Sequence, residues 1–384
     1  MDKIEQLLAQ RQSKGLLRVL RPADLRKDGK IHQNGRVLFD FSSNDYLGLA
    51  GHCELKKASK KATEKLGTGS GASRLLSGDL KIHHELEERT AQFKGKESAL
   101  VFNSGYQANV GIISALYKSG DAVFCDKLSH ASILDGILLS AARLFRFRHN
   151  DISHLESLLK KSEGKFRNRL IVTESVFSMD GDRAPLKEMV GLKEKYGCEI
   201  MVDEAHATGI FGKDGSGVVA EECLVERVDL LMGTFSKALG SFGAYIACSK
   251  SIKEYLINMC RSFIYSTALP PCVVAANIAA LEIVGKESFR REALLANAAY
   301  FRSELERKGF EIQSQSQIVP LIVGDAEKAT AMSEHLIDKG YLALAIRPPT
   351  VPQGGSRLRF SLSWHHNKQV LQDLTNQIGK VDDV

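Results

Sequence analysis

The sequence predicts an α/β protein in which helices cover both faces of a mainly parallel β-sheet. From Glu97 onward, short apolar runs alternate with amphipathic helical stretches, an order typical of such sheets. The composition, 43% hydrophobic and 26% charged, is that of a globular protein, and 384 residues suffice for two domains. Because ligands bind at the carboxyl ends of parallel strands, the residues that follow each apolar run are the candidates for function.

The predicted elements follow the chain in order. An amphipathic helix is expected from Ile4 to Leu20, and a strand from Arg36 to Ser43 precedes the loop 44–48. Seven apolar runs predict the strands of the sheet, at 99–102, 122–125, 144–147, 170–173, 200–202, 230–232 and 244–248. Helical patterns occupy 54–65, 80–93, 106–117, 152–159 and 186–196.

The segment 66–78, LGTGSGASRLLSG, is dense in glycine and serine. Such a composition is typical of a flexible linker. Arg74 and Leu75 in its middle, and the helical patterns on both sides, favour an ordered loop at an active site or interface.

Composition also excludes several classes of protein. No run is long enough to span a membrane, and the N-terminal segment is amphipathic rather than secretory. The seven cysteines are scattered and form no C-x-x-C pair, which argues against a zinc site or a disulfide framework and favours the reducing cytoplasm. The net charge of +6 comes without long basic tracts, so no nucleic acid partner is expected.

The stretch from Met232 to Ala244, MGTFSKALGSFGA, places a single lysine among small residues directly after an apolar run. Desolvation at such a position favours the neutral, nucleophilic amine, so Lys237 is a candidate for forming a Schiff base. Gly240 and Gly243 are expected to bring the backbone close to a ligand. The alternative is an ordinary lysine at a helix start beside a tight turn.

Polar residues follow the ends of five apolar runs. They are Asn103–Tyr106, Asp126–His130, Glu174 with Ser178, Asp203–His206 and Thr234–Lys237. A structural sheet does not need acid, imidazole, hydroxyl and amine groups at successive strand ends. We therefore interpret these residues as one site.

The side chains of this site fit one cofactor. Ser104, Gly105 and Tyr106 open a helix, whose free N–H groups favour phosphate, although such residues are also common caps. A buried Asp203 needs a cationic partner such as a protonated ring nitrogen. His206 can bond a ring hydroxyl and His130 can stack on a ring. With Lys237, these groups meet the requirements of pyridoxal phosphate.

Two other interpretations of these motifs are weaker. The string Asp203–His206, DEAH, also occurs in helicases, but no G-x-x-x-x-G-K-[ST] loop lies upstream. No metal-binding pattern is present either.

The strings FSSNDYLGL, DKLSHAS, VTESVFSMDGD, MVDEAHATG, GTFSKALG, YSTALPP and AIRPPTVPQGGSRLR resemble the α-oxoamine synthases, which are fold-type I pyridoxal-phosphate enzymes. The resemblance extends from about Ile4 to the last helix. It implies a large cofactor domain at 45–285 with a seven-stranded, mainly parallel sheet. An N-terminal helix and strand segment at 1–44 precedes it, and a smaller α+β domain at 286–384 follows.

The resemblance also implies roles for individual residues. Lys237, His130 and Asp203 would be catalytic: Lys237 holds the cofactor covalently and acts as base, Asp203 pairs with the ring nitrogen, and His130 stacks on the ring. The other implied cofactor contacts are Gly105, Tyr106, Ser178, His206, Thr234, Ser266 and Thr267. Ser266 or Thr267 would come from a second subunit, which implies a homodimer with shared active sites.

The implied substrate contacts are Arg18, Asn44, His130, Thr350 and Arg359. Arg357 and Arg359 lie on one face of a predicted strand, and either guanidinium could grip an amino-acid carboxylate. Of the two, Arg359 is our choice.

The implied reaction is a decarboxylative condensation of an amino acid with an acyl thioester. The segment 345–352, AIRPPTVP, most resembles members that join L-alanine to a pimeloyl thioester, because glycine-using members tend to carry tyrosine near Arg347 and Pro348. The alternatives are a glycine-using synthase, an aminotransferase and an inactive partner-binding relative. The acyl carrier, coenzyme A or an acyl carrier protein, stays open. A basic set that could bind either, or form a solvated face, comprises Arg143, Arg146, Arg148, Arg167 and Arg169.

Overall fold

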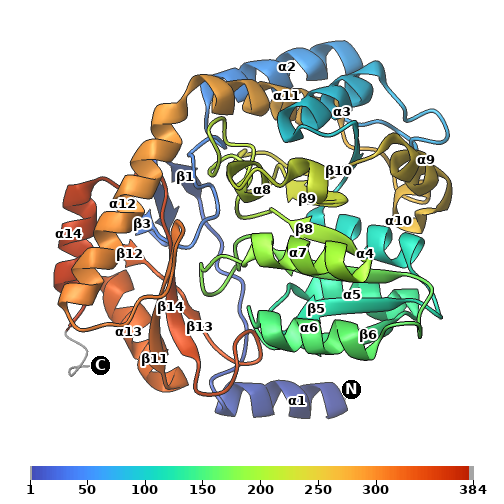
Figure 1. The fold of residues 1–384 in the computed structure, drawn as a ribbon. Helices are drawn as coiled ribbons and strands as arrows, with labels where there is room; N and C mark the ends of the chain where they lie inside the picture. Colours follow the sequence, from blue (N-terminus) through green and yellow to red (C-terminus); the bar gives the residue numbers. More distant parts are fainter. Residues whose placement is uncertain (1, 380–384) are drawn as a thin grey trace. The chain divides into compact units, whose positions relative to one another are not determined.

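The computed structural model describes residues 2–379, which form two compact units. One unit comprises residues 1–48, 179–182 and 292–384, and the other comprises 49–178 and 183–291. The larger unit carries the central sheet (Figure 1). The domain boundaries expected after residues 44 and 285 stay predictions.

The central sheet has seven strands and is mainly parallel, as predicted. Only β10, among its strands, runs antiparallel to its neighbours. Each strand is a short apolar run, as expected where both faces of a parallel sheet are covered. In spatial order the strands are β4 (Ser98–Phe102), β10 (Ala244–Cys248), β9 (Leu230–Thr234), β8 (Glu199–Asp203), β7 (Arg169–Glu174), β5 (Ala122–Asp126) and β6 (Arg143–Phe147).

Helices cover both faces of this sheet (Figure 1). On one face, α4 (Gly105–Leu116) and α5 (Ala131–Ser140) pack on Val123, Val172 and Met201 in a fully buried core. Residues that alternate with these along the strands point to the other face, where α6 (Ile152–Lys161) and α7 (Leu186–Tyr196) lie. The remaining helices of this unit are α2 (Cys53–Leu66), α3 (Lys81–Lys94), α8 (Val218–Glu221), α9 (Lys250–Met259), α10 (Arg261–Ile264) and α11 (Pro271–Lys286), with a 3-10 turn at Val225–Arg227.

The other unit contains two small sheets. The first joins β1 (Leu25–Lys27), β2 (Lys30–Gln33), β3 (Arg36–Asp40) and β12 (Tyr341–Leu342), so the start of the chain pairs with a strand near its end. The second joins β11 (Ile318–Gly324), β14 (Ser356–Ser361) and β13 (Ala345–Ile346). The helices are α1 (Asp2–Ser13), α12 (Ser288–Arg307), α13 (Ala326–Asp338) and α14 (Lys368–Gln377).

The first helix is shorter than predicted, and the structure decides between the two interpretations of the segment 66–78. The first helix ends at Ser13 instead of Leu20, because Gly15 adopts a left-handed conformation with φ 62°. The glycine-rich segment 66–78 is an ordered loop, since Ser70 Oγ donates to the carbonyl of Leu269 at 2.6 Å and Arg74 bonds two carboxylates. The linker interpretation is therefore wrong.

Gly240 is needed for packing against another segment of the chain. Its φ is +64°, and a Cβ there would lie 2.3 Å from the backbone nitrogen of Ala50 and 2.4 Å from the carbonyl carbon of Leu49. The close backbone approach predicted for this glycine is real, but the structure shows it against the segment Leu49–Ala50.

We predict that Gly240→Ala lowers the free energy of unfolding by about 2 kcal/mol or more, because both the conformation and the contact oppose a side chain. Gly191→Ala is the matched control, since Gly191 lies in α7 with open space around it. That control should gain about 0.5–1 kcal/mol from helix propensity. Denaturant unfolding measures both variants, and equal stability of the two would contradict the argument.

Candidate active site

Lys237 lies in the turn that follows β9, and its amine contacts an imidazole. Lys237 Nζ lies 2.8 Å from His206 Nε2. His206 belongs to the turn that follows β8. Thr234, at the end of β9, donates its hydroxyl to the carbonyl of Gly243 at 2.8 Å and accepts the N–H of Ser236 at 3.0 Å. The Thr234 side chain therefore shapes the turn that presents Lys237.

Asp203 ends β8 as a buried carboxylate. Its Oδ2 accepts from Asn109 Nδ2 at 2.9 Å, and its Oδ1 accepts from the N–H of Ala205 at 2.9 Å. Asn109 lies on α4, one turn after Gly105. Both oxygens of the carboxyl group are thus held in place by neutral donors, and a buried acid of this kind favours a cationic partner.

His130 caps α5, and a second buried carboxylate holds it. The N–H of His130 donates to Glu174 Oε1 at 2.7 Å, and its Nδ1 accepts from the N–H of Ser132 at 3.2 Å. Desolvation lowers the pKa of His130, which favours a neutral ring. The ring remains accessible, as a stacking surface must be.

Glu174 lies beside Asp203 in the sheet, where β7 and β8 pair in parallel register. Burial raises the pKa of Glu174 to about 8, and the negative charge of Asp203 adds to the rise. Two buried carboxyl groups thus lie close to the amine of Lys237. This part of the site favours an additional positive charge.

The start of α4 forms the candidate phosphate seat. Ser104 caps the helix by accepting the N–H of Gln107 at 3.2 Å, and the first turn leaves the N–H groups of Gly105 and Tyr106 without intrahelical acceptors. A Cβ on Gly105 would lie 3.0 Å from Met232 Cε, so the glycine allows the helix to approach β9. The Tyr106 ring is half exposed, and its hydroxyl donates to Asp135.

Three further predicted cofactor residues lie in the same unit. Ser178 follows β7 by four residues. Ser266 Oγ accepts from Gln107 Nε2 at 3.0 Å, and the carbonyl of Thr267 accepts from Asn103 Nδ2 at 2.9 Å. Within one chain, Ser266 and Thr267 therefore contact the residues around the start of α4.

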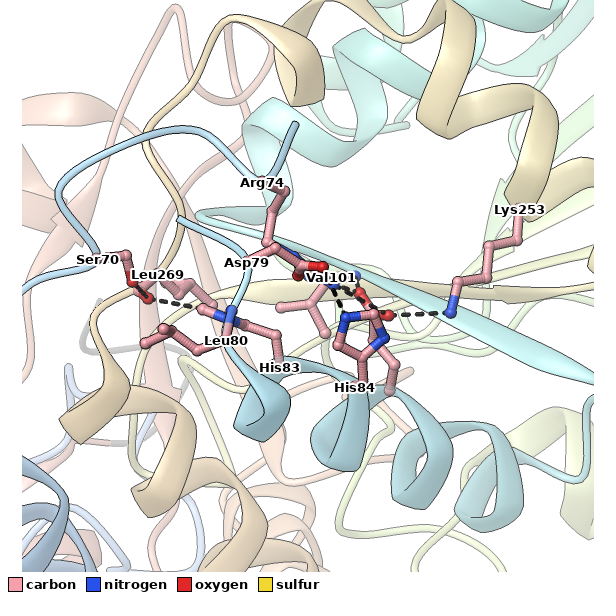
Figure 2. Close-up of polar contacts among 10 residues, drawn as sticks. Ser70, Arg74, Asp79, Leu80, His83, His84, Val101, Lys253 and Leu269 are labelled. Atoms are coloured by element: carbon pink, nitrogen blue, oxygen red, sulfur yellow. Dashed lines mark hydrogen bonds and ion pairs between the residues drawn. The ribbon is translucent and has the colours of Figure 1, made fainter. Parts of the chain in front are cut away.

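A buried ionic network supports the segment that carries Ser266 and Thr267 (Figure 2). Glu87, on α3, accepts from Arg74 and from Lys253, each at 2.9 Å, and from the N–H of Val101 at 3.2 Å. His83 Nε2 bonds the carbonyl of Leu269 at 2.9 Å. Together these contacts connect the loop 66–78, β4 and α9 to the segment 266–269.

The predicted substrate residues lie in the other unit, where they form two groups. Arg359 Nη2 donates to Asn44 Oδ1 at 3.3 Å and to Tyr46 Oη at 3.4 Å. Arg18 Nη2 donates to Thr350 Oγ1 at 3.0 Å. The second pair lines a pocket of about 240 Å³ whose other lining residues are Leu16, Ala345, Ile346, Arg347 and Pro348.

Arg357 has a different environment from Arg359. It forms an ion pair with Asp180 at 2.5 Å and donates to the carbonyls of Gly355 and Met179. The motif SMDGD thus holds Arg357, whereas Arg359 faces the loop that carries Asn44.

The basic set at 143–169 is largely engaged within the fold. Arg146 donates to the carbonyl of Lys127 at 2.5 Å, Arg148 pairs with Asp151 at 2.7 Å, and Arg167 donates to the carbonyl of Ser119 at 2.8 Å. These contacts favour the interpretation as a solvated structural face.

Comparisons with known proteins agree with this geometry. The model of the family "Aminotransferase class I and II" matches residues 36–378. An 8-amino-7-oxononanoate synthase from Geobacter sulfurreducens is 50% identical over 97% of this chain and 96% of its own. The structure of a Sphingomonas wittichii serine palmitoyltransferase has a TM-score of 0.93 and 33% identity over 98% and 96% of the two chains. That of an 8-amino-7-oxononanoate synthase from Francisella tularensis has a TM-score of 0.77 and 29% identity over 90% and 99%.

Fold and site together define a pyridoxal-phosphate-dependent transferase of fold type I. Within that class, the chain belongs to the 8-amino-7-oxononanoate synthase family of acyltransferases. The fold class and the cofactor expected from the sequence are thereby confirmed.

The residues of the site fit pyridoxal phosphate. Asp203 and Glu174 are adjacent buried acids, the charge of Asp203 helps to raise the pKa of Glu174 to about 8, and a protonated ring nitrogen would offset the cost of burying negative charge here. Asn109 Oδ1 is a buried acceptor for which the described residues provide no donor.

In residues 2–379 no helix is long and apolar enough to cross a membrane, and no group of histidine, cysteine and acidic residues could hold a metal.

Sequence patterns missed three groups in these sites. Asn109 could have been found from its position four residues after Gly105, which places both on one face of α4. Tyr46 follows Asn44 in the motif SSNDYLG, and Asp180 lies in SMDGD. For these two, the sequence shows a polar loop but does not show which arginine it will meet.

We predict that Glu174→Gln makes stability less dependent on pH. Because the pKa of Glu174 rises from 4.5 to about 8 on folding, its contribution to stability is fully present below about pH 4.5 and is lost as pH rises toward 8. Glutamine keeps an acceptor for the N–H of His130 but does not titrate. Urea unfolding of the cofactor-free chain from pH 5 to 8 should show the variant gaining on the parent protein. A constant difference across that range would refute the assignment.

Proposed function

We propose that this protein condenses L-alanine with a pimeloyl thioester to give 8-amino-7-oxononanoate, carbon dioxide and the free thiol, in biotin biosynthesis. The observation that carries the proposal is the contact of Lys237 Nζ with His206 Nε2, beside the buried Asp203 at the end of the neighbouring strand. The name of the 50% identical relative supports the choice of product.

Each residue of the site has a role in this proposal. Lys237 would hold the cofactor covalently, and its free amine would move the proton to and from the α-carbon of alanine. Asp203 would pair with the positive charge of the ring nitrogen, with Asn109 fixing the carboxylate. His206 orients the Lys237 amine and would bond the phenolic oxygen of the cofactor. His130 would stack on the ring and donate to the thioester oxygen. When bound, pyridoxal phosphate withdraws electron density from the α-carbon.

The cofactor phosphate would be held by the start of α4 and by side chains near it. Gly105 and Tyr106 contribute N–H groups there. We propose Ser178, Thr234, Ser266 and Thr267 as further contacts, with the last two reaching the site of a second copy of the chain. Exposed large side chains at Tyr106, Phe242 and Tyr265 support a homodimer in which such surfaces are covered.

The substrates would be selected by the other unit. We propose that Arg359 grips the alanine carboxylate, with Asn44 and Tyr46 fixing its guanidinium. Arg18 and Thr350 would contact the acyl chain, whose distal carboxylate suits the cationic pocket that also includes Arg347. Either coenzyme A or an acyl carrier protein is compatible with these contacts.

Seven free cysteines support a cytoplasmic location.

The proposal is tested by adding L-alanine and then pimeloyl-coenzyme A to the holoenzyme while visible absorbance and carbon dioxide are followed. We expect carbon dioxide release that requires both substrates. Pyruvate formation with loss of the visible band would instead identify an aminotransferase. Lys237→Ala should lose the covalent cofactor and at least about 10³-fold in turnover. A Lys237→Ala variant with full turnover would remove the central assignment.

We predict that Arg359→Lys raises the KM for alanine by about tenfold or more, because lysine cannot form the bidentate contact of a guanidinium. Arg357→Lys is the matched control on the same strand. It should weaken the contact with Asp180 and lower thermal stability, with little change in the KM for alanine. Steady-state kinetics of the two variants distinguish these residues, and the reverse pattern would assign the carboxylate to Arg357.

A further inference from the structure

A buried ion pair joins Lys94 to Glu204, the residue that follows Asp203 of the candidate site. Lys94, the last residue of α3, and Glu204, which follows Asp203, are both almost fully buried. Lys94 Nζ donates to Glu204 Oε2 and to the carbonyl of Ser216. The other oxygen, Glu204 Oε1, accepts the N–H of Val219 at 2.9 Å. The mechanism above uses neither charge.

The backbone around this ion pair is shaped to admit it. A Cβ on Gly217 would lie 2.2 Å from Glu204 Oε2, so only glycine fits beside the carboxylate. The φ of Gly217 is +122°, which L-amino acids with side chains rarely adopt. The segment from Ser216 to Val219 therefore wraps closely around Glu204.

The ion pair continues to a tyrosine and a threonine. The charge of Lys94 interacts with the buried hydroxyl of Tyr245, which hydrogen-bonds Thr208 Oγ1 at 2.8 Å. Tyr245 lies on β10 opposite Gly233 of β9, where a Cβ would lie 2.2 Å from the tyrosine oxygen. Gly233, four residues before Lys237, is thus required for the ring of Tyr245 to enter.

These contacts fix both ends of the turn that carries His206. At one end, the N–H of Glu204 donates to the carbonyl of Met232 at 2.8 Å. The carbonyl of Glu204 accepts the N–H groups of Ala207 and Thr208, each at 2.9 Å. At the other end, Thr208 is held by Tyr245. His206 lies between these anchors, with its Nε2 on the amine of Lys237.

We propose that Lys94, Glu204 and Tyr245 are positioning residues that set the imidazole of His206 against Lys237 and the cofactor. Buried ion pairs commonly add little net stability, because the cost of desolvation offsets the attraction between the charges. A fixed geometry is the better explanation for this one, since it closes a ring of contacts from Glu204 through Lys94 and Tyr245 to Thr208, with His206 inside. The proposal rests on the proposed roles of Lys237 and His206.

The test is a pH titration of the visible absorbance of the holoenzyme, together with the Kd of pyridoxal phosphate. Tyr245→Phe removes one hydroxyl without leaving a charge unpaired. Lys94→Met leaves Glu204 unpaired, and the double variant Lys94→Met, Glu204→Gln removes both charges. We expect each to shift the midpoint of the titration by at least about half a unit and to raise the Kd several-fold. The double variant should recover thermal stability but retain the shift.

The control is Tyr117→Phe, at the C-terminal end of α4. Tyr117 donates to Glu199 Oε2 at 2.6 Å, at the start of β8, and is as buried as Tyr245. It should lose stability with an unchanged midpoint and Kd. If Tyr245→Phe and the double variant also keep both values, the ring is merely structural and the proposal is overturned. Failure of the proposed function would look different, because L-alanine and pimeloyl-coenzyme A would then release no carbon dioxide, whereas the midpoint and the Kd are measured without either substrate.

Discussion

The arrangement depends on the cost of burying negative charge at the carboxyl edge of a parallel sheet. Asp203 and Glu174 end adjacent strands, and both are removed from water. Neighbouring groups satisfy their oxygens with the neutral donors of Asn109, Ala205 and His130. Hydrogen bonds from neutral donors hold both carboxyl groups without supplying a positive charge, so the edge stays attractive to a cationic ring nitrogen.

The same edge illustrates why Lys237, which is partly exposed, is distinct from the buried Lys94. Lys94 is paired with the carboxylate of Glu204 and also donates to the backbone carbonyl of Ser216. Lys237 instead meets an imidazole, which can donate or accept and can therefore accompany the amine through a change of protonation. One lysine thus has a charged partner, and the other contacts a group that can donate or accept.

Much of the fold and of the candidate site could be predicted from the sequence. The seven strands were evident because each is a short apolar run, and polar residues at their ends located Asp203, His130 and Lys237. The order of the strands and the antiparallel direction of β10 could not be read in that way, because apolar runs look alike whichever neighbour they join. Pairings across long stretches of chain, such as Arg357 with Asp180, cannot be read from the sequence either, because a polar loop does not show which arginine it will meet.

The residue at Gly233 has a consequence for how such chains diversify. Its hydrogen occupies space that any larger group would take from the hydroxyl of Tyr245. A chain in which position 245 has become smaller, and in which the Thr208 hydroxyl 2.9 Å from such a Cβ can shift, acquires room for alanine or serine at 233, whereas a chain that keeps the tyrosine does not. The two positions should therefore change together during evolution, and pairs of related sequences should rarely show a substitution at 233 alone.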